Sequence, residues 1–266
     1  MIVRSYEIKA QEICSQVRIA LVTDLHSCYY GEGQEKLVSA IRGQSPDIVL
    51  LGGDIFDDRI ADTNTERFLA GIAGQYPIYY VTGNHEYRSG PEKFAIKMSI
   101  LKKYGVTVLS GVCEVIEING VKLNLCGADD PASYMVRFDR REDPQGYKKA
   151  KLEKLNTFDQ QLDALKAQAR EGYFTILLTH RPELFERYVA RGFDLVLSGH
   201  AHGGQWRIPG VLNGLLAPNQ GLFPPYAGGR YERGSTTMIV SRGLAKETTF
   251  VPRIFNPPEL VVVTIT

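Results

Sequence analysis

Five apolar runs in this chain are each followed directly by a polar turn that carries Asp, Asn or His. The clearest run extends from Phe193 to Leu197 and ends in Ser198-Gly199-His200-Ala201-His202-Gly203-Gly204. Short apolar runs closed by glycine turns are typical of buried strands, and ligand sites in α/β sheets tend to lie at strand ends. The pattern therefore predicts a sheet protein with a polar site at the ends of its strands.

The first half of the chain alternates between strand-like and helix-like segments. Residues 17–23, 47–51 and 77–81 predict buried strands, and each is followed by a segment with apolar residues at helical spacing. Thr63-Asn64-Thr65-Glu66 is a candidate capping box for the second helix, and Pro91 suits the first position of the third. Three rounds of strand, polar turn and helix predict a parallel sheet.

The pattern changes after residue 105. Short strands are expected at 106–109, 113–118 and 121–126, and Asn119-Gly120 is a type I′ hairpin signal between the last two. Residues 129–149, with a charged run at 139–143, predict a solvated loop. The remaining expected elements are helices at 152–169 and 182–191 and strands at 173–179, 193–197, 236–241 and 260–265.

Length and composition limit the possible classes of protein. A chain of 266 residues without a linker-like boundary predicts a single domain over residues 1–266. Lys and Arg number 31 against 30 Asp and Glu, which argues against a nucleic-acid partner. No run approaches the roughly 20 apolar residues of a membrane span, and residues 1–10 show no signal peptide.

The four cysteines are scattered along the chain without a Cys-x-x-Cys pair. This spacing argues against structural zinc and against a disulfide framework. We therefore expect a reducing, cytoplasmic location.

The polar clusters at the five strand ends offer carboxylate, imidazole and amide groups but no thiolate. They are Asp24-x-His26, Gly53-Asp54-x-x-Asp57, Gly83-Asn84-His85-Glu86, His180 and Gly199-His200-x-His202. This donor set suits divalent ions such as Mn, Fe or Zn. Seven ligands exceed the needs of one tetrahedral ion and fit two ions about 3.5–4 Å apart that share a carboxylate. Each cluster alone has a plainer reading: Asp24 and Asp54 as helix caps, His180 as a core residue, Asn84 as a turn residue.

In this order, the five clusters resemble the calcineurin-like metallophosphoesterase family. Phe223-Pro224-Pro225-Tyr226 and the segment 252–260 further resemble its bacterial branch with a Gly-His-x-His-Gly-Gly-Gln signature. The resemblance implies an α/β four-layer sandwich of two mixed β-sheets flanked by helices. It also implies two divalent metal ions per chain, of Mn, Fe or Zn.

The resemblance also implies a role for each candidate residue. The first metal would be held by Asp24, His26, Asp54 and His202, and the second by Asp54, Asn84, His180 and His200. His85 would face the phosphate and stabilise or protonate the leaving oxygen, and Asp57 would hold the His85 ring. Many family members place Arg directly after the second Asp of the Gly-Asp-x-x-Asp cluster. Here Asp58 intervenes, which puts a phosphate-binding role for Arg59 in doubt.

The expected function is that of a dinuclear metal-dependent phosphohydrolase that acts on a phosphodiester or a pyrophosphate. The alternatives are a catalytically silent binding module and a nuclease. The complete ligand set disfavours the silent module, and the near-neutral net charge disfavours the nuclease. The irregular, aromatic-rich segment 203–235 and the pair Tyr29-Tyr30 suggest a phosphorylated small molecule or a lipid-linked substrate, with peripheral membrane contact. These side chains could equally pack the end of the sheet.

Overall fold

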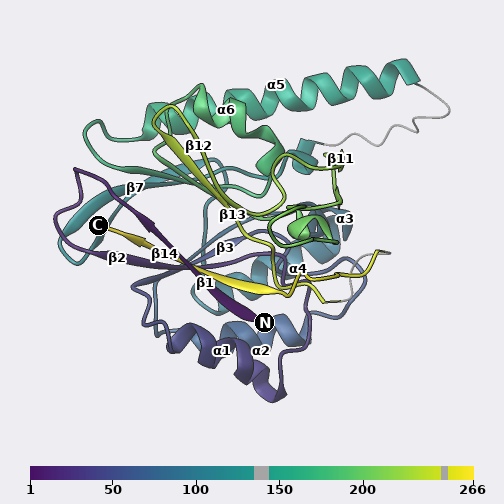
Figure 1. Cartoon of the computed structure of the whole chain (residues 1–266), viewed down its shortest axis with the longest axis horizontal. Coiled ribbons are helices and arrows are strands. Elements are labelled where there is room, and N and C mark those ends of the chain that lie inside the picture. The colour runs from purple at the N-terminus through teal and green to yellow at the C-terminus, as the bar shows by residue number, and fades with distance from the viewer. Residues whose placement is uncertain (135–143, 247–250) are drawn as a thin grey trace.

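Two six-stranded mixed sheets form the centre of the computed structural model, which describes residues 1–134, 144–246 and 251–266 (Figure 1). The first sheet contains, in spatial order, β1 (Ile2–Ile8), β14 (Glu259–Ile265), β2 (Val17–Val22), β3 (Ile48–Gly52), β4 (Ile78–Val81) and β5 (Thr107–Val108). Strands β2 to β5 run parallel, whereas β14 is antiparallel to β2 and parallel to β1. The parallel sheet expected from the first half of the chain is confirmed.

The second sheet is parallel at its centre and antiparallel at both edges. It contains, in spatial order, β12 (Gly229–Arg233), β13 (Thr236–Val240), β9 (Leu195–Ser198), β8 (Thr175–Leu178), β7 (Val121–Gly127) and β6 (Val112–Ile118). The pairs β12–β13 and β6–β7 are antiparallel, and the pairs between β13, β9, β8 and β7 are parallel. A separate short hairpin joins β10 (Leu216–Ala217) and β11 (Gly221–Leu222).

Helices cover the outer face of each sheet. Buried residues of α1 (Glu35–Arg42), α2 (Thr63–Ile72) and α4 (Pro91–Lys103) pack on the first sheet. Buried residues of α5 (Pro144–Gln168) and α6 (Phe185–Val189) pack on the second. The order helix, sheet, sheet, helix is the four-layer sandwich that the family resemblance implied. Among the described residues, no helix combines the length and apolar character needed to cross a membrane.

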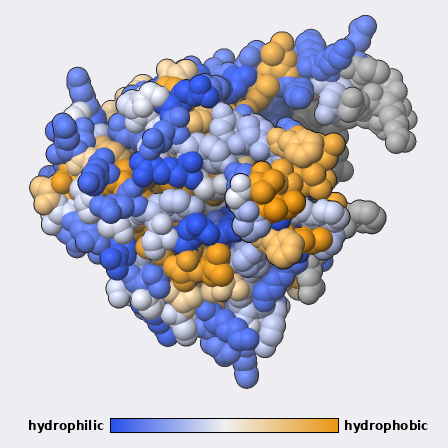
Figure 2. All heavy atoms as spheres, in the orientation of Figure 1, coloured by the Kyte–Doolittle hydropathy of each residue, from blue (hydrophilic) through white to orange (hydrophobic). Residues whose placement is uncertain are grey.

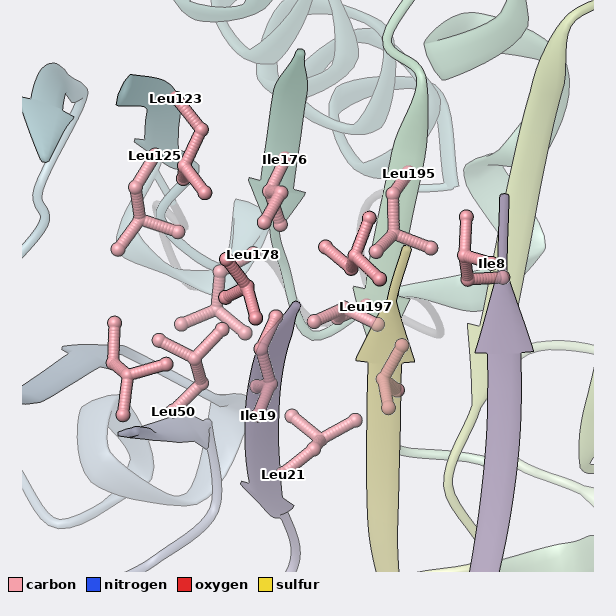
Figure 3. Close-up of a cluster of buried hydrophobic side chains, with 14 of the residues drawn as sticks. Ile8, Ile19, Leu21, Leu50, Leu123, Leu125, Ile176, Leu178, Leu195 and Leu197 are labelled. Carbon is pink, nitrogen blue, oxygen red and sulfur yellow. The ribbon is translucent and has the colours of Figure 1, made fainter. Parts of the chain in front are cut away.

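The layer between the two sheets is a single apolar cluster (Figure 3). Ile19, Leu21 and Leu50 from the first sheet face Ile176, Leu178, Leu195 and Leu197 from the second. The central strands are therefore buried on both faces, one against this cluster and the other against helices. Such strands read as continuous apolar runs rather than as alternating patterns, which explains why the sequence located them well.

One local prediction in the first half of the chain is wrong. Helix α2 does begin at Thr63, but its N-cap is Asp62 and no capping box forms. The Asp62 carboxylate instead accepts hydrogen bonds from the buried Lys97 ammonium, with both distances 3.0 Å. The strand expected at 106–109 is confirmed as β5, which extends the first sheet beside β4.

The solvated loop expected at 129–149 is also wrong at both ends. Asp129 and Asp130 are buried, and α5 already begins at Pro144. The charged run at 139–143 lies outside the described residues. Short 3₁₀ helices complete the fold: η1 (Glu32–Gln34), η2 (Pro131–Tyr134), η3 (Pro182–Leu184) and η4 (His202–Gly204).

A disulfide joins Cys113 on β6 to Cys126 on β7, which corrects the expectation drawn from the cysteine spacing. The Asn119-Gly120 turn, with φ of 53° and 79°, sets the register of this hairpin. Counting outward from the turn pairs residue 118 with 121 and Cys113 with Cys126. The cysteine pattern therefore gives no support to a reducing compartment.

Thiol counting tests this disulfide. Protein purified without reductant and then denatured should show two alkylated thiols, on Cys14 and Cys28, and four after reduction. Mass spectrometry reads both numbers. Cys113→Ser should show three thiols without reduction, because Cys126 then lacks its partner. Four reactive thiols in the unreduced wild type would contradict the disulfide.

Candidate metal centre

The nine residues that the sequence singled out lie together where both sheets end. Asp24 and His26 follow β2, Asp54 and Asp57 follow β3, and the segment from Asn84 begins α3 (Asn84–Arg88) after β4. The second sheet contributes His180 after β8 and His200 and His202 after β9. Asp24, His26, Asp54, Asp57, Asn84, His180, His200 and His202 are buried, and His85 is half-buried.

Several of these residues adopt the left-handed backbone conformation. Asp24, His26 and Asp54 have φ near 50°, and His200 and His202 have φ of 65° and 47°. This conformation costs about 1–2 kcal/mol for a residue with a Cβ. Strain of this kind persists where the surrounding structure requires it, which is most often at functional sites. Here the left-handed residues direct the turns after β2, β3 and β9 toward the candidate metal centre.

One cluster brings together Asp24, His26 and His202. His202 Nε2 lies 3.7 Å from Asp24 Oδ1, and His26 Nε2 lies 3.7 Å from Asp54 Oδ2. The other ring nitrogen of His26, Nδ1, contacts Asp57 Oδ2 at 3.0 Å. A hydrogen on Nδ1 leaves the lone pair of His26 Nε2 directed into the cluster.

A second cluster brings together Asp54, His180 and His200. His180 Nε2 lies 3.1 Å from Asp54 Oδ2 and 3.2 Å from His200 Nδ1. His180 Nδ1 contacts the Gly52 carbonyl at 2.9 Å, which directs Nε2 into the cluster. The side-chain oxygen of Asn84 lies 3.0 Å from His200 Nδ1. Asp54 Oδ2 therefore stands between the two clusters.

The charges of these groups favour cation binding. Burial alone would raise the pKa of Asp54, but the neighbouring His180 and His26 hold it well below its ordinary value. Burial lowers the pKa of His202 to about 3, and burial together with Arg181 lowers that of His200. Burial opposes a charge on His180 as well, yet Asp54 raises its pKa to about 10. The His180 proton thus occupies a position that a metal ion could take.

The side chains present fit a divalent metal. His26 Nε2 and His202 Nδ1 are buried without a hydrogen-bond partner among the described residues. Asn84 presents an oxygen to a ring nitrogen, although swapping its amide atoms would give a hydrogen bond. Two donor atoms that bind the same ion, each at about 2.0–2.2 Å, lie about 3 Å from each other. The contacts among Asp54, His180, His200 and Asn84 have this spacing.

The family comparison agrees with this geometry. The model of the calcineurin-like phosphoesterase family matches residues 17–204. The chain belongs to the calcineurin-like phosphoesterase family. The matched region extends from β2 through the Gly-His-x-His turn and therefore includes every predicted ligand.

Individual relatives extend the comparison. An uncharacterized metallophosphoesterase of Helicobacter pylori is 29% identical over 91% of this chain and 58% of its own length, so the chain spans little more than half of that protein. Phosphodiesterase YaeI of Escherichia coli is 29% identical over 62% of this chain and 52% of its own length. A dimetal phosphatase from Danio rerio has a similar fold, with a TM-score of 0.51, 13% identity and coverage of 85% and 87% of the two chains.

Glu86 organises two turns beside the clusters and received no role in the sequence analysis. Its buried carboxylate accepts hydrogen bonds from the backbone N–H groups of Gly83, Asp54, Ile55 and Phe56, at 2.9–3.2 Å. Gly83 allows the close approach, since a Cβ there would collide with the Asp54 side chain. The sequence did contain a signal for this role. Glu86 is a charged residue directly after His85, in a turn that follows an apolar strand.

Asp58 is the second residue whose contact the sequence did not reveal. His85 Nδ1 lies 2.6 Å from Asp58 Oδ1 and 3.5 Å from Asp57 Oδ2. The shorter contact of Asp57 is instead the one to His26, at 3.0 Å. The two adjacent carboxylates thus serve different imidazoles. The Arg59 side chain is 89% exposed, and its Nε lies 3.9 Å from Asp58.

Arg181 and Asp130 form a buried pair behind His200. The Arg181 guanidinium donates to both carboxylate oxygens of Asp130, and its Nη1 lies 2.8 Å from His200 Nε2. Burial opposes the charge of Arg181, but Asp130 more than compensates and raises its pKa. This pair fixes the orientation of the His200 ring through Nε2, while Nδ1 faces His180. The signal in the sequence was weak, because the two residues are 51 positions apart.

Metal-dependent stabilisation tests the centre. Adding Mn²⁺ or Zn²⁺ to chelator-treated protein at 100 times Kd should stabilise it by about 2.7 kcal/mol, or about 5–10 °C for a chain of this size. Asp54→Asn should lose most of this shift, because Asp54 contacts both clusters. Asp163→Asn, at an exposed carboxylate on α5, is the matched control and should keep it. Differential scanning fluorimetry measures the shifts, and an equal shift in Asp54→Asn would contradict the site.

Proposed function

We propose that this chain is a dinuclear metal-dependent phosphohydrolase that acts on a phosphodiester or a pyrophosphate. The position of Asp54 Oδ2 carries the proposal. This oxygen is buried and lies 3.7 Å from His26 Nε2 and 3.1 Å from His180 Nε2. A carboxylate between two imidazole clusters is suited to bridge two ions.

The ligand assignment follows the two clusters. Asp24, His26, Asp54 and His202 would hold one ion, and Asp54, Asn84, His180 and His200 the other. Mn, Fe and Zn all suit these donors. When bound, such ions lower the pKa of a water molecule to about 7 and neutralise charge on the phosphoryl oxygens, as an in-line displacement requires.

His85 would act on the leaving group rather than on a metal. Its ring is 18% exposed, whereas the ring of His26 is fully buried. Asp58 holds Nδ1 at 2.6 Å, which fixes the ring orientation. Burial would lower the pKa of His85, but Asp57, Asp54 and Asp58 raise it to about 9, so that the ring carries a proton at neutral pH. A charged imidazole at the mouth of the site is suited to donate that proton to a departing oxygen.

The alternatives receive less support. A silent binding module would be expected to have lost a ligand or His85, and all nine predicted residues lie together. A nuclease should show a strongly basic face, whereas Lys and Arg exceed Asp and Glu by only one. Salt-dependent DNA binding would favour the nuclease. The name of the YaeI relative supports a diester substrate. A cytoplasmic location stays a prediction.

Substitutions at the three acid–base residues separate their roles. His85→Ala should lower kcat by about 10²–10⁴ while the chain keeps about two ions. Asp58→Asn should lower kcat about 10-fold or more, with metal content and KM nearly unchanged, because it acts through the His85 ring. Asp57→Asn should instead weaken metal binding about 10–100-fold, because His26 loses its partner.

Elemental analysis and steady-state kinetics on the reconstituted proteins measure these effects, with Asp163→Asn as the matched control. Loss of metal in His85→Ala would show that His85 is a ligand. Equal metal loss in Asp57→Asn and Asp58→Asn would refute the division between the two carboxylates.

Substrate preference tests the proposed reaction. The metal-loaded enzyme should hydrolyse bis(p-nitrophenyl) phosphate with a kcat/KM at least about tenfold above that for p-nitrophenyl phosphate, a difference of about 1.4 kcal/mol. Both substrates release the same chromophore, so one assay compares them directly. A clear preference for the monoester would argue against the diesterase while leaving the metal centre intact.

A further inference from the structure

Three loops beside the metal centre carry a group of exposed apolar side chains. We call it the apolar rim, and it consists of Trp206, Ile208, Val211, Leu222, Phe223, Ile254 and Phe255. Val211, Phe223 and Phe255 are the most exposed, at 82%, 67% and 73%. Figure 2 shows apolar residues gathered on this face, in the region where Figure 1 places β11. Contiguous apolar surface of this kind marks an interaction site in a soluble domain.

The rim is held together and fixed to the metal centre. Trp206 pairs with Ile254 in a β-bridge, and the Leu215 backbone connects Trp206 to Phe223 through hydrogen bonds of 2.9 and 2.8 Å. On the inner side, Asn256 Nδ2 donates to the His202 carbonyl at 2.7 Å. Whatever binds the rim is therefore brought next to a candidate metal ligand.

Phe223 and Phe255 are unfavourable to the fold in two separate ways. Their φ angles are 54° and 50°, a left-handed conformation that suits Gly or Asn. Among the other non-glycine residues with positive φ in the described part of the chain, every side chain is polar. Both rings are also mostly exposed to water. Since both rings are mostly exposed and both positions disfavour a large side chain, the aromatic identity points to a partner outside the chain.

The charge of these loops indicates what kind of partner that is. Residues 203–230 and 251–256 contain Arg207, Arg230 and Arg253 but no Asp or Glu. Arg230 pairs with Glu232 at 2.5 Å, so the positive charge that acidic residues of the described chain do not balance belongs to Arg207 and Arg253. Positive charge beside exposed aromatic and aliphatic side chains matches a membrane surface with anionic lipids. Trp206 adds a side chain that favours the boundary between lipid and water.

We propose that the apolar rim inserts into the surface of a bilayer that contains anionic lipids, without crossing it. The metal centre then faces phosphate groups that belong to membrane-borne molecules. This second statement rests on the proposed hydrolase function, whereas the membrane contact does not depend on it.

Vesicle sedimentation tests the proposal. The wild-type chain should sediment with vesicles of phosphatidylcholine and phosphatidylglycerol at 3:1 and bind at least about tenfold more weakly to phosphatidylcholine alone. The double variant Phe223→Asn/Phe255→Asn should lose binding to the mixed vesicles by about tenfold or more. Asparagine tolerates the left-handed backbone, so this variant should keep or increase its melting temperature. Leu152→Asn removes an exposed apolar residue from α5 and should bind like the wild type.

Three results would overturn the membrane contact. The first is absence of wild-type binding to either vesicle, and the second is binding that the double variant retains. The third is a concentration-dependent dimer of the wild type that the double variant loses, because the rim would then contact a second copy. The assay needs no turnover, so a chain that binds vesicles but hydrolyses no diester would refute only the proposed function.

Discussion

The contact between Asp54 and His180 joins the two sheets at the point where the function depends on their alignment. Asp54 follows β3 in the first sheet and His180 follows β8 in the second, and Asp54 Oδ2 lies 3.1 Å from His180 Nε2. Asp54 Oδ1 accepts the His85 backbone N–H at 2.8 Å, which also fixes the start of α3. A shift of either sheet would break both metal clusters, so the apolar layer between the sheets also maintains the site.

The surrounding carboxylates explain how so many polar groups can be buried together. An isolated buried charge is strongly unfavourable, and removing one partner of a buried pair costs about 3–5 kcal/mol. Here each buried acid has its own donors: backbone N–H groups for Glu86, Arg181 for Asp130 and His26 for Asp57. Among the buried acceptor atoms without a donor in the described residues, His26 Nε2 and His202 Nδ1 belong to the cluster of Asp24, His26 and His202. These two ring nitrogens are therefore available to bind a cation.

The apolar runs predicted the central strands and the polar clusters that follow them for a common physical reason, whereas the four-layer architecture and the ligand roles were implied by the family resemblance. Strands buried on both faces appear as continuous apolar runs, and the ligands follow these runs directly. What the sequence could not predict depends on conformations within turns or on distant pairing. The turn that begins at Asp54 decides whether Asp57 or Asp58 approaches His85. Asp54 itself has a φ of 51°. The Cys113–Cys126 disulfide follows from the Asn119-Gly120 turn, because the register that this turn sets places the two cysteines opposite each other. The spacing of the cysteines alone does not reveal this pairing.

Left-handed residues separate two kinds of constraint in this molecule. At Asp24, Asp54 and His200 the strained backbone directs polar atoms into the metal clusters, so the strain is explained within the chain. At Phe223 and Phe255 the same conformation directs rings toward water. Folding alone would favour Gly or Asn at both positions, since these residues adopt a left-handed backbone at lower cost and expose no apolar ring. The two phenylalanines therefore stand where the fold itself would favour other residues, and a binding partner outside the chain would account for them.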